Sequence, residues 1–359
     1  MPKLLEKHKR HLTSVVFILG FVLDNLTLTR VDLFYDNLVL TAYLIIACFG
    51  IVISHLYAEG RLDHIHRKPF WIFISRWHPL LVQFSFGGLF SGYVIFYSRS
   101  GSFIESWPFL LFLVSVIAGN ELIKKRHFLT FQLSVFFVAI FSYAIFSLPV
   151  LLGKIGADIF LLSGFISLAV FALLTIVLKF LSPIRTDRLR FILTSVGVIY
   201  LLFNAAYFSN AIPPIPLSPK EIGIYHSVTR LPDGNYAVTF EPDTKFFFFK
   251  GVSKKFNRVS NEPVYAYSSV FAPTSIDTKV FHRWSYYNRE KGAWLVSDRF
   301  EFPLFGGRDG GYRGYSVKEN IFPGKWRVDV VTERGQLIER IEFKVVSANI
   351  APNLESSLR

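Results

Sequence analysis

The pattern of apolar and polar residues changes once along the chain, near residue 212. Before that point, long apolar runs are separated by short polar segments, and each run approaches the roughly 20 residues that a helix needs to cross a bilayer. The runs cover residues 12–28, 38–57, 80–97, 107–123, 128–152, 155–181 and 191–212. We therefore predict that residues 1–212 form a multi-pass membrane bundle of about seven transmembrane helices.

After residue 219, apolar and polar residues alternate as they do in strands with one buried face. Trp326, Val328 and Val330, for example, alternate with Arg327 and Asp329. Turn residues interrupt the alternation about every eight to twelve residues, which is typical of an all-β sandwich. The predicted strands cover residues 222–230, 236–241, 245–252, 264–272, 279–287, 294–303, 312–318, 325–332 and 337–345. The pattern predicts an immunoglobulin-like β-sandwich over residues 220–348.

Two short segments complete the predicted organisation. Residues 213–219 read Pro-Pro-Ile-Pro-Leu-Ser-Pro, which ends the last helix and predicts a short, semi-rigid linker. Residues 349–359 are predicted to be a disordered tail.

Composition and charge narrow the class of partner. Hydrophobic residues make up 52% of the 359 residues, and the formal net charge is +13. No nucleic-acid motif accompanies this charge, and basic loops of membrane proteins meet anionic lipid headgroups. We therefore expect contact with membrane lipids and no nucleic-acid partner. Because Cys48 is the only cysteine, a disulfide within the chain is excluded.

The distribution of Lys and Arg between the predicted helices indicates a topology, because these residues accumulate in cytoplasmic loops. One set of helix ends carries Lys3, Lys7, Lys9, Arg10, Arg61, Arg67, Lys68, Arg76, Lys124, Lys125, Arg126, Arg185, Arg188 and Arg190. The opposite set carries only Arg30, Arg99 and Lys154. This bias places the N-terminus in the cytoplasm, and an odd number of helices then places the residues after Pro213 outside it.

Polar residues inside the predicted helices are costly in a bilayer and are candidates for functional groups. They are Asp24, Asn25, Asn120, Glu121 and Asn204. Asp24 and Asn25, at the outer end of the first helix, either form a cation site or proton relay or remain hydrated at the interface. The other three either line a polar cavity or form hydrogen bonds between helices.

The outer domain contains a second group of candidates for binding. They are His282, Trp284, Arg308, Tyr312, Arg313, Tyr315 and Trp326. The glycine-rich stretch 305–316 combines backbone amides with two arginines, which suits a phosphate or a carboxylate. The alternative is a turn between strands whose arginines pair with neighbouring carboxylates.

Signals for catalysis, cofactors and metals are weak. His282 lacks a nucleophile motif such as G-x-S-x-G, so packing in the sandwich is favoured over a role as general base. His64 and His66 supply two possible zinc ligands, but solvated loop histidines are the favoured interpretation. We predict no catalytic residues, no cofactor and no metal site, and we favour a role other than that of an enzyme.

Several landmarks of the C-terminal part occur in a fixed order. They are His282-Arg283-Trp284, Gly306-Gly307-Arg308, Gly311–Ser316, Pro323–Val330, and Thr332 with Gly335-Gln336. Together they resemble a bacterial family, the domain of unknown function 2914, in which Trp often stands at the position of Tyr315. The resemblance implies a small β-sandwich at the C-terminus of a membrane protein. It assigns no activity and transfers no catalytic residues.

These observations predict a bacterial inner-membrane protein with a periplasmic β-sandwich. We expect this domain to act as a binding module for a protein partner or for an envelope polymer such as a glycan, close to the membrane surface. The alternative is a transporter, channel or lipid-handling protein whose helices carry the activity, with the sandwich as a lid. The sequence leaves the oligomeric state open.

Overall fold

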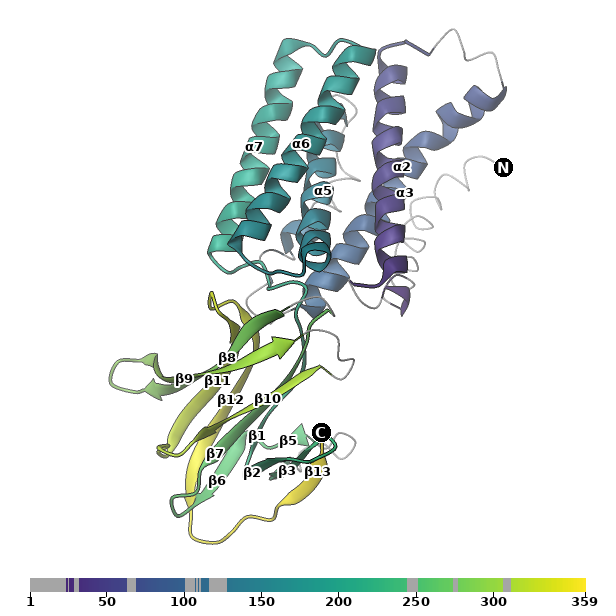
Figure 1. The fold of residues 1–359 in the computed structure, drawn as a ribbon. Coiled ribbons are helices and arrows are strands. Elements are labelled where there is room, and N and C mark those ends of the chain that lie inside the picture. The colour runs from purple at the N-terminus through teal and green to yellow at the C-terminus, as the bar shows by residue number, and fades with distance from the viewer. Residues whose placement is uncertain are drawn as a thin grey trace, which may run out of the picture. The chain divides into compact units, whose positions relative to one another are not determined.

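The computed structural model describes residues 24, 26–28, 32–62, 69–100, 107, 109, 111–115, 128–243, 251–273, 277–305 and 311–359. The chain divides into two compact units, one of residues 1–98 with 106–212 and the other of residues 99–105 with 213–359. The first unit is helical and the second is built from strands (Figure 1).

The helical unit contains five long apolar helices among its described residues (Figure 1). They are α2 (Phe34–Ala58), α3 (Pro69–Arg99), α5 (Phe128–Leu152), α6 (Ala157–Leu181) and α7 (Thr186–Phe208). Each is long and apolar enough to cross a membrane. The predicted count of seven is not confirmed. The predicted spans 12–28 and 107–123 lie largely outside the described residues, with only residues 24, 26, 27, 107, 109 and 111–115 seen as helical.

Helix α5 is the most enclosed of these helices. Of the residues in its apolar stretch, 72% are buried, whereas only 22% of those in α7 are. Helix α5 therefore packs inside the unit, and α7 keeps a broad exposed face. Phe141 of α5 stacks on Phe203 of α7 with ring centroids 4.7 Å apart. Hydrogen bonds tie α5 to other helices as well, because Tyr93 donates to the Ala139 carbonyl at 2.8 Å and the Thr41 and Tyr143 hydroxyls lie 2.7 Å apart. Aromatic packing and a few polar contacts therefore hold the bundle.

The second unit consists of thirteen strands among the described residues. They are β1 (Ser218–Tyr225), β2 (Ser227–Arg230), β3 (Tyr236–Phe240), β4 (Pro242–Asp243), β5 (Gly251–Val252), β6 (Lys255–Val259), β7 (Val264–Phe271), β8 (Asp277–Asn288), β9 (Ala293–Phe305), β10 (Tyr312–Lys318), β11 (Gly324–Thr332), β12 (Leu337–Ala348) and β13 (Glu355–Leu358). Strands β3 and β7 to β12 confirm the predicted strands at these positions to within a few residues.

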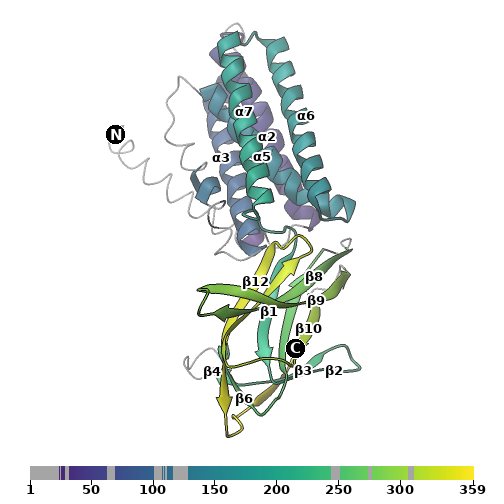
Figure 2. The same ribbon diagram turned by 90° about the vertical axis from the view of Figure 1, so that its left-hand side faces the viewer.

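The strands form three principal sheets, ordered β1-β7-β10, β6-β12-β11-β8-β9 and β13-β3-β2, with β4-β5 as a small extra pair. The first two sheets share a core that includes Val264, Trp284, Trp326 and Phe343, so they pack face to face (Figure 1, Figure 2). A smaller core, with Tyr225, Val238 and Tyr267 among its residues, lies between β1-β7-β10 and β13-β3-β2. This unit is a layered β domain, and the finer prediction of an immunoglobulin-like fold is not confirmed.

Three local predictions need correction. The strand predicted over 222–230 is two strands in different sheets, because β1 pairs with β7 whereas β2 pairs with β3. Strand β1 begins at Ser218, inside the segment predicted to be a linker. The predicted disordered tail contains β13, which pairs with β3 through backbone hydrogen bonds. Most of the strand predicted over 245–252 lies outside the described residues.

Candidate functional site

Two of the predicted binding residues, His282 and Trp284, belong to a hydrogen-bonded network inside the domain. Nε2 of His282 lies 2.7 Å from the Ser268 hydroxyl, and Nδ1 lies 2.9 Å from the Ser316 hydroxyl. The Trp284 indole also donates to the Ser316 hydroxyl, at 2.9 Å. Both His282 and Trp284 are fully buried. The network joins β8 to β7 and β10 and so ties the two sheets of the main core together.

The environment of His282 keeps the ring neutral. Burial lowers the pKa of His282 to about 3, because the charged imidazolium loses its hydration there. Its hydrogen-bonding partners are two serine hydroxyls, which suit a neutral imidazole with one donor and one acceptor nitrogen. Since the ring is also closed to solvent, the structure places His282 in the core of the domain and not on its surface.

Trp326 is also a core residue. It is fully buried, and its indole donates to the Phe322 carbonyl at 2.8 Å. Trp284 and Trp326 were both candidates for binding, but in the structure both fill the space between the sheets. The signal that could have identified the network is Ser316, the last residue of the glycine-rich landmark, which sequence reasoning passed over.

The glycine-rich candidates separate in the structure. Arg308 lies outside the described residues. Arg313 is hydrogen-bonded within the domain, because its Nη1 donates to the Asn235 side chain and to the Arg359 carbonyl, both at 2.9 Å. Tyr312 is half-buried, whereas Tyr315 is 41% exposed. Of the predicted outer-domain candidates that are described, Tyr315 alone presents a large exposed surface.

The outward face of the five-stranded sheet contains a charged cluster that sequence reasoning missed. Asp329 of β11 has Arg283 of β8 and Arg340 of β12 as its register partners. Arg283 Nη2 donates to Asp329 Oδ2 at 2.8 Å, while Arg340 donates to Oδ1 at 2.6 Å and to Oδ2 at 3.2 Å. Arg327 Nε lies 3.7 Å from Oδ2. Three arginines therefore surround one carboxylate, which leaves a surplus of positive charge.

The carboxylate of Asp329 is held in its ionised form by these arginines. Burial alone would raise the pKa of Asp329, but the hydrogen bonds from Arg340 and Arg283 outweigh burial and lower it below the ordinary range. The Asp329 side chain is fully buried although it lies on the outward face, because the arginines cover it, and their own side chains remain 17–29% exposed.

Aromatic side chains lie beside this cluster. The Arg327 guanidinium is 4.7 Å from the centre of the Trp294 ring, and the Lys325 ammonium is 5.9 Å from that of Tyr287. Tyr287 and Trp294 are register partners on β8 and β9, with ring centroids 5.4 Å apart. We call the set Arg283, Tyr287, Trp294, Lys325, Arg327, Asp329 and Arg340 the outer-face cluster. Arginines next to half-buried aromatic rings are a common composition of binding surfaces.

The polar candidates of the helical unit do not form a common site in the described residues. Asn204 donates to the Tyr200 carbonyl at 2.8 Å, one turn earlier on α7, so its amide is satisfied within its own helix. Asp24 is half-buried. Asn25, Asn120 and Glu121 lie outside the described residues.

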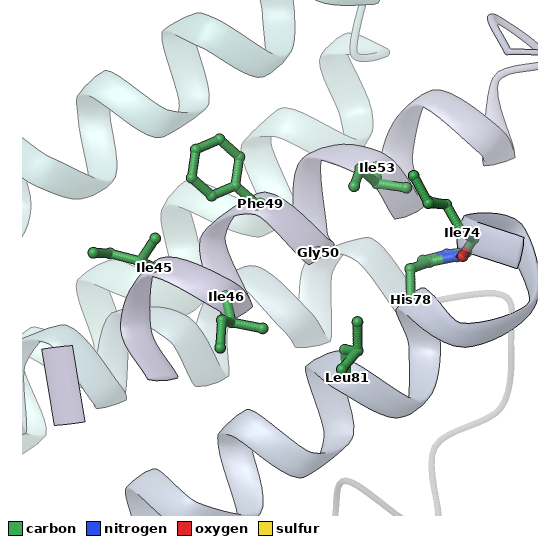
Figure 3. Close-up of a pocket in the computed structure, with 8 residues that line it drawn as sticks. All are labelled: Ile45, Ile46, Phe49, Gly50, Ile53, Ile74, His78 and Leu81. Atoms are coloured by element: carbon green, nitrogen blue, oxygen red, sulfur yellow. The ribbon is translucent and has the colours of Figure 1, made fainter. Parts of the chain in front are cut away.

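A pocket of about 290 Å³ lies between α2 and α3. Figure 3 shows the side chains that surround it, which are Ile45, Ile46, Phe49, Ile53, Ile74, His78 and Leu81, together with Gly50. His78 is the only polar side chain of this lining, and its Nδ1 lies 3.1 Å from the Ile74 carbonyl oxygen. An apolar pocket with its polar group satisfied internally suits a hydrocarbon chain.

Comparison with known proteins identifies a family for part of the chain. Residues 277–345 match the family described as "Protein of unknown function (DUF2914)", which confirms the resemblance of the C-terminal part. No curated protein matches the chain. Among solved structures, the alkylpurine DNA glycosylase AlkC of Pseudomonas fluorescens, bound to DNA containing an abasic site analog, aligns at 12% identity over 89% of this chain and 100% of that chain. Its TM-score of 0.20 supports no inference about fold or function.

Proposed function

We propose that the helical unit spans a bacterial inner membrane and displays the β domain on the outer side as a binding module for an acidic envelope polymer. The five long apolar helices support the membrane assignment. The β domain supplies the binding surface, because the charged and aromatic groups described above gather on one sheet face.

The charge pattern around α7 supports the orientation whatever the total number of helices. Arg185, Arg188 and Arg190 lie at its beginning, whereas residues 209–217 after it contain no Lys or Arg. Positive charge marks the cytoplasmic end of a helix, so α7 runs outward and the β domain follows it outside. Labelling of a single cysteine at Ser297 in a Cys48→Ser background tests this with a membrane-impermeant maleimide. Labelling in intact spheroplasts is expected, and labelling only after lysis would refute the orientation.

The single observation that carries the binding proposal is the outer-face cluster. Residues of the opposite face of the same strands, such as Trp284 and Trp326, lie in the core under the facing sheet and cannot contact a partner. The outer-face cluster instead combines three arginines around one carboxylate with Trp294 and Tyr287, and such a surface is complementary to sugar rings bearing negative charge.

The test is capture of polysaccharides from bacterial envelope fractions by the purified full chain in detergent. Trp294→Ala is expected to weaken capture about tenfold, since a buried aromatic contact contributes on the order of 1–2 kcal/mol. Tyr315→Ala, on a different sheet, is the matched control and is expected to retain capture. The assignment of the binding surface to the outer-face cluster is contradicted if Tyr315→Ala loses capture and Trp294→Ala keeps it. The proposed function fails if the wild type retains only proteins or nothing.

A second candidate function is lipid handling by the helices, and the pocket between α2 and α3 favours it. Its occupant would be a lipid acyl chain, because the lining is apolar and the helices are of membrane-spanning length. Photo-crosslinking with a diazirine fatty acid is expected to label α2, and Ile46→Trp, which fills the pocket, is expected to reduce that labelling. Leu173→Trp, on the exposed side of α6, is the control. Equal labelling of α2 in both variants would remove the basis for this function.

A further inference from the structure

We propose that Arg283, Ser285 and Arg327 form a subsite for an oxyanion, namely a carboxylate or phosphate group carried by a sugar of the bound polymer. This inference rests on the proposed function, because it names the chemical group that the outer-face cluster recognises. The argument has three parts, which are the placement of the three residues, their unmet hydrogen-bonding capacity and the charge around them.

The register of two strands brings the three residues together. Arg327 of β11 is the register partner of Ser285 of β8, and Asp329 is the partner of Arg283. Side chains two residues apart on a strand point to the same face, and neighbouring strands are about 4.8 Å apart. Arg283, Ser285 and Arg327 are therefore neighbours on the outward face of the sheet.

Each of the three residues has a buried donor without a hydrogen-bond partner in the described part of the chain. These donors are Arg283 Nε, Arg327 Nε and the Ser285 hydroxyl. Ser285 is itself fully buried, and a buried polar atom without a partner is costly. Arg283 uses Nη2 on Asp329, whereas the nearest carboxylate oxygen to Arg327 is 3.7 Å away, too far for a hydrogen bond. Neighbouring side chains of the outward face cover these donors, so an incoming anion would satisfy them by displacing the Arg283 and Arg327 side chains, which are 29% and 17% exposed.

The electrostatic field of this face favours an anion. Its cationic residues include Arg283, Arg299, Arg327, Arg340, Lys279, Lys325 and Lys344. The carboxylates beside them are Asp329, which is shared by three of the arginines, Glu342, opposite Arg327, and Glu301, which pairs with Lys279. Because positive groups outnumber these carboxylates, an added oxyanion reduces repulsion among the arginines.

The aromatic neighbours indicate that the anion belongs to a larger ligand. Trp294 packs against the Arg327 guanidinium, and Tyr287 on β8 is the register partner of Trp294. Val296, the register partner of Ser285 on β9, is 60% exposed. A sugar ring lying on this apolar border would place a carboxylate or phosphate substituent over Arg327 and Ser285. An acidic glycan supplies both the anionic substituent and the ring that packs on the aromatic side chains, whereas a free inorganic anion supplies only the charge.

Binding of defined polymers to the full chain in detergent tests this proposal. Polygalacturonate carries carboxylates, a sugar-phosphate polymer carries phosphates, and dextran is neutral. We expect both acidic polymers to bind more tightly than dextran, and binding to weaken as salt is added. Arg327→Gln is expected to weaken acidic-polymer binding about 10- to 100-fold, the effect of losing a charge-assisted hydrogen bond. Arg230→Gln makes the same charge change at an exposed position of β2 and is expected to bind as the wild type does.

Ser285→Ala provides a second variant, which removes one hydroxyl without altering charge and is expected to weaken binding about threefold or more. Protease resistance of the β domain checks that each variant is folded. Unchanged binding by folded Arg327→Gln and Ser285→Ala overturns the subsite, as does equal affinity of the wild type for dextran and polygalacturonate. If only the variants bind as the wild type does, the proposed function survives provided that Trp294→Ala still reduces binding; equal affinity for dextran contradicts the preference for acidic polymers as well. If the wild type binds none of the polymers, both proposals fail.

Discussion

The two faces of the five-stranded sheet use adjacent residues of the same strands for different purposes. On the inward face, His282 and Trp284 have all their polar side-chain atoms paired within the core. On the outward face, Arg283 and Ser285, each one position along β8 from those residues, keep donors without a partner among the described residues. The comparison shows that neighbouring residues of one strand differ in role, because the inward residues hold the sheets together while the outward residues carry the donors on which the proposed subsite rests.

The largest effect should come from the inward face. Trp284→Ala is expected to lower the free energy of unfolding by about 3–5 kcal/mol, because it removes a fully buried indole and leaves a cavity. It also deprives the Ser316 hydroxyl of a donor. The measurement is the urea dependence of protease resistance of the β domain in the full chain.

Tyr287→Ala is the matched outward-face change on the same strand. Because Tyr287 is only half-buried, its loss is expected to cost less than half as much stability. Similar losses in the two variants would contradict the distinction between the faces.

The next largest effect concerns Asp329, the carboxylate that three arginines share on the outward face. Asp329→Asn removes the charge shared by Arg283, Arg327 and Arg340 and is expected to cost about 2–3 kcal/mol. This is below the cost for a fully buried ion pair, because the arginines still reach solvent.

The pH dependence of Asp329 gives the same interaction a second readout. Since its pKa is lowered in the folded state, the carboxylate contributes fully above about pH 4, its unfolded pKa. The contribution is lost as the pH falls further, through the folded pKa. Asp329→Asn should therefore remove part of the acid sensitivity in this range. An unchanged acid transition would mean that the arginine cluster contributes little to folding.

A third prediction uses His282 and Glu339, whose shifted pKa values have opposite effects on stability as the pH falls. His282 has a folded pKa of about 3 and an unfolded pKa of about 6.5, so the unfolded chain binds a proton first and stability falls as the pH drops through that window. Burial, with a smaller contribution from Glu221, raises the pKa of Glu339 to about 7. Its folded form therefore binds a proton first, and stability rises as the pH drops from about 7 to about 4.5.

Single variants separate the two contributions. His282→Gln is expected to remove a slope of up to about 1.4 kcal/mol per pH unit below pH 6.5, so that stability increases on acidification to pH 5. Glu339→Gln is expected to leave the histidine unopposed, so that stability falls on acidification over the same range. The measurement is the free energy of unfolding at pH 5, 6 and 7. The same pH dependence in His282→Gln as in the wild type would show that the buried histidine does not control this range.

Long apolar runs predicted the five long helices, and local alternation, which residues such as Trp326, Arg327 and Val328 display directly, predicted most strands. It did not predict β13, since Glu355-Ser356-Ser357-Leu358 has no apolar alternation and is held by backbone pairing to β3. The division between β1 and β2 was also missed, because the change of partner from β7 to β3 interrupts no sequence pattern.

The candidate site was predicted less well, for a physical reason. Alternation shows that His282 and Arg283 face opposite sides of a strand, but it does not show which side another sheet covers. Histidine and tryptophan were chosen for their chemistry, yet Ser268 and Ser316, from distant strands, satisfy them in the core. Arg283, Arg327 and Asp329 were visible in the same landmarks, whereas Arg340 lies beyond them. Their assembly depends on the register of β8, β11 and β12, which sequence alone does not supply.

The smallest expected effect tests Tyr315, the exposed residue among the predicted candidates. Its ring lies at the edge of the smaller core, with its centroid 6.2 Å from that of Tyr265 and 6.1 Å from that of Tyr236. Because the side chain is 41% exposed, Tyr315→Ala is expected to change the free energy of unfolding by only about 0.5 kcal/mol. Polymer binding should stay unchanged, since Tyr315 is on β10 of another sheet. Loss of polygalacturonate binding in a variant with unaltered protease resistance would move the ligand from the arginine-bearing face to the tyrosine-bearing one.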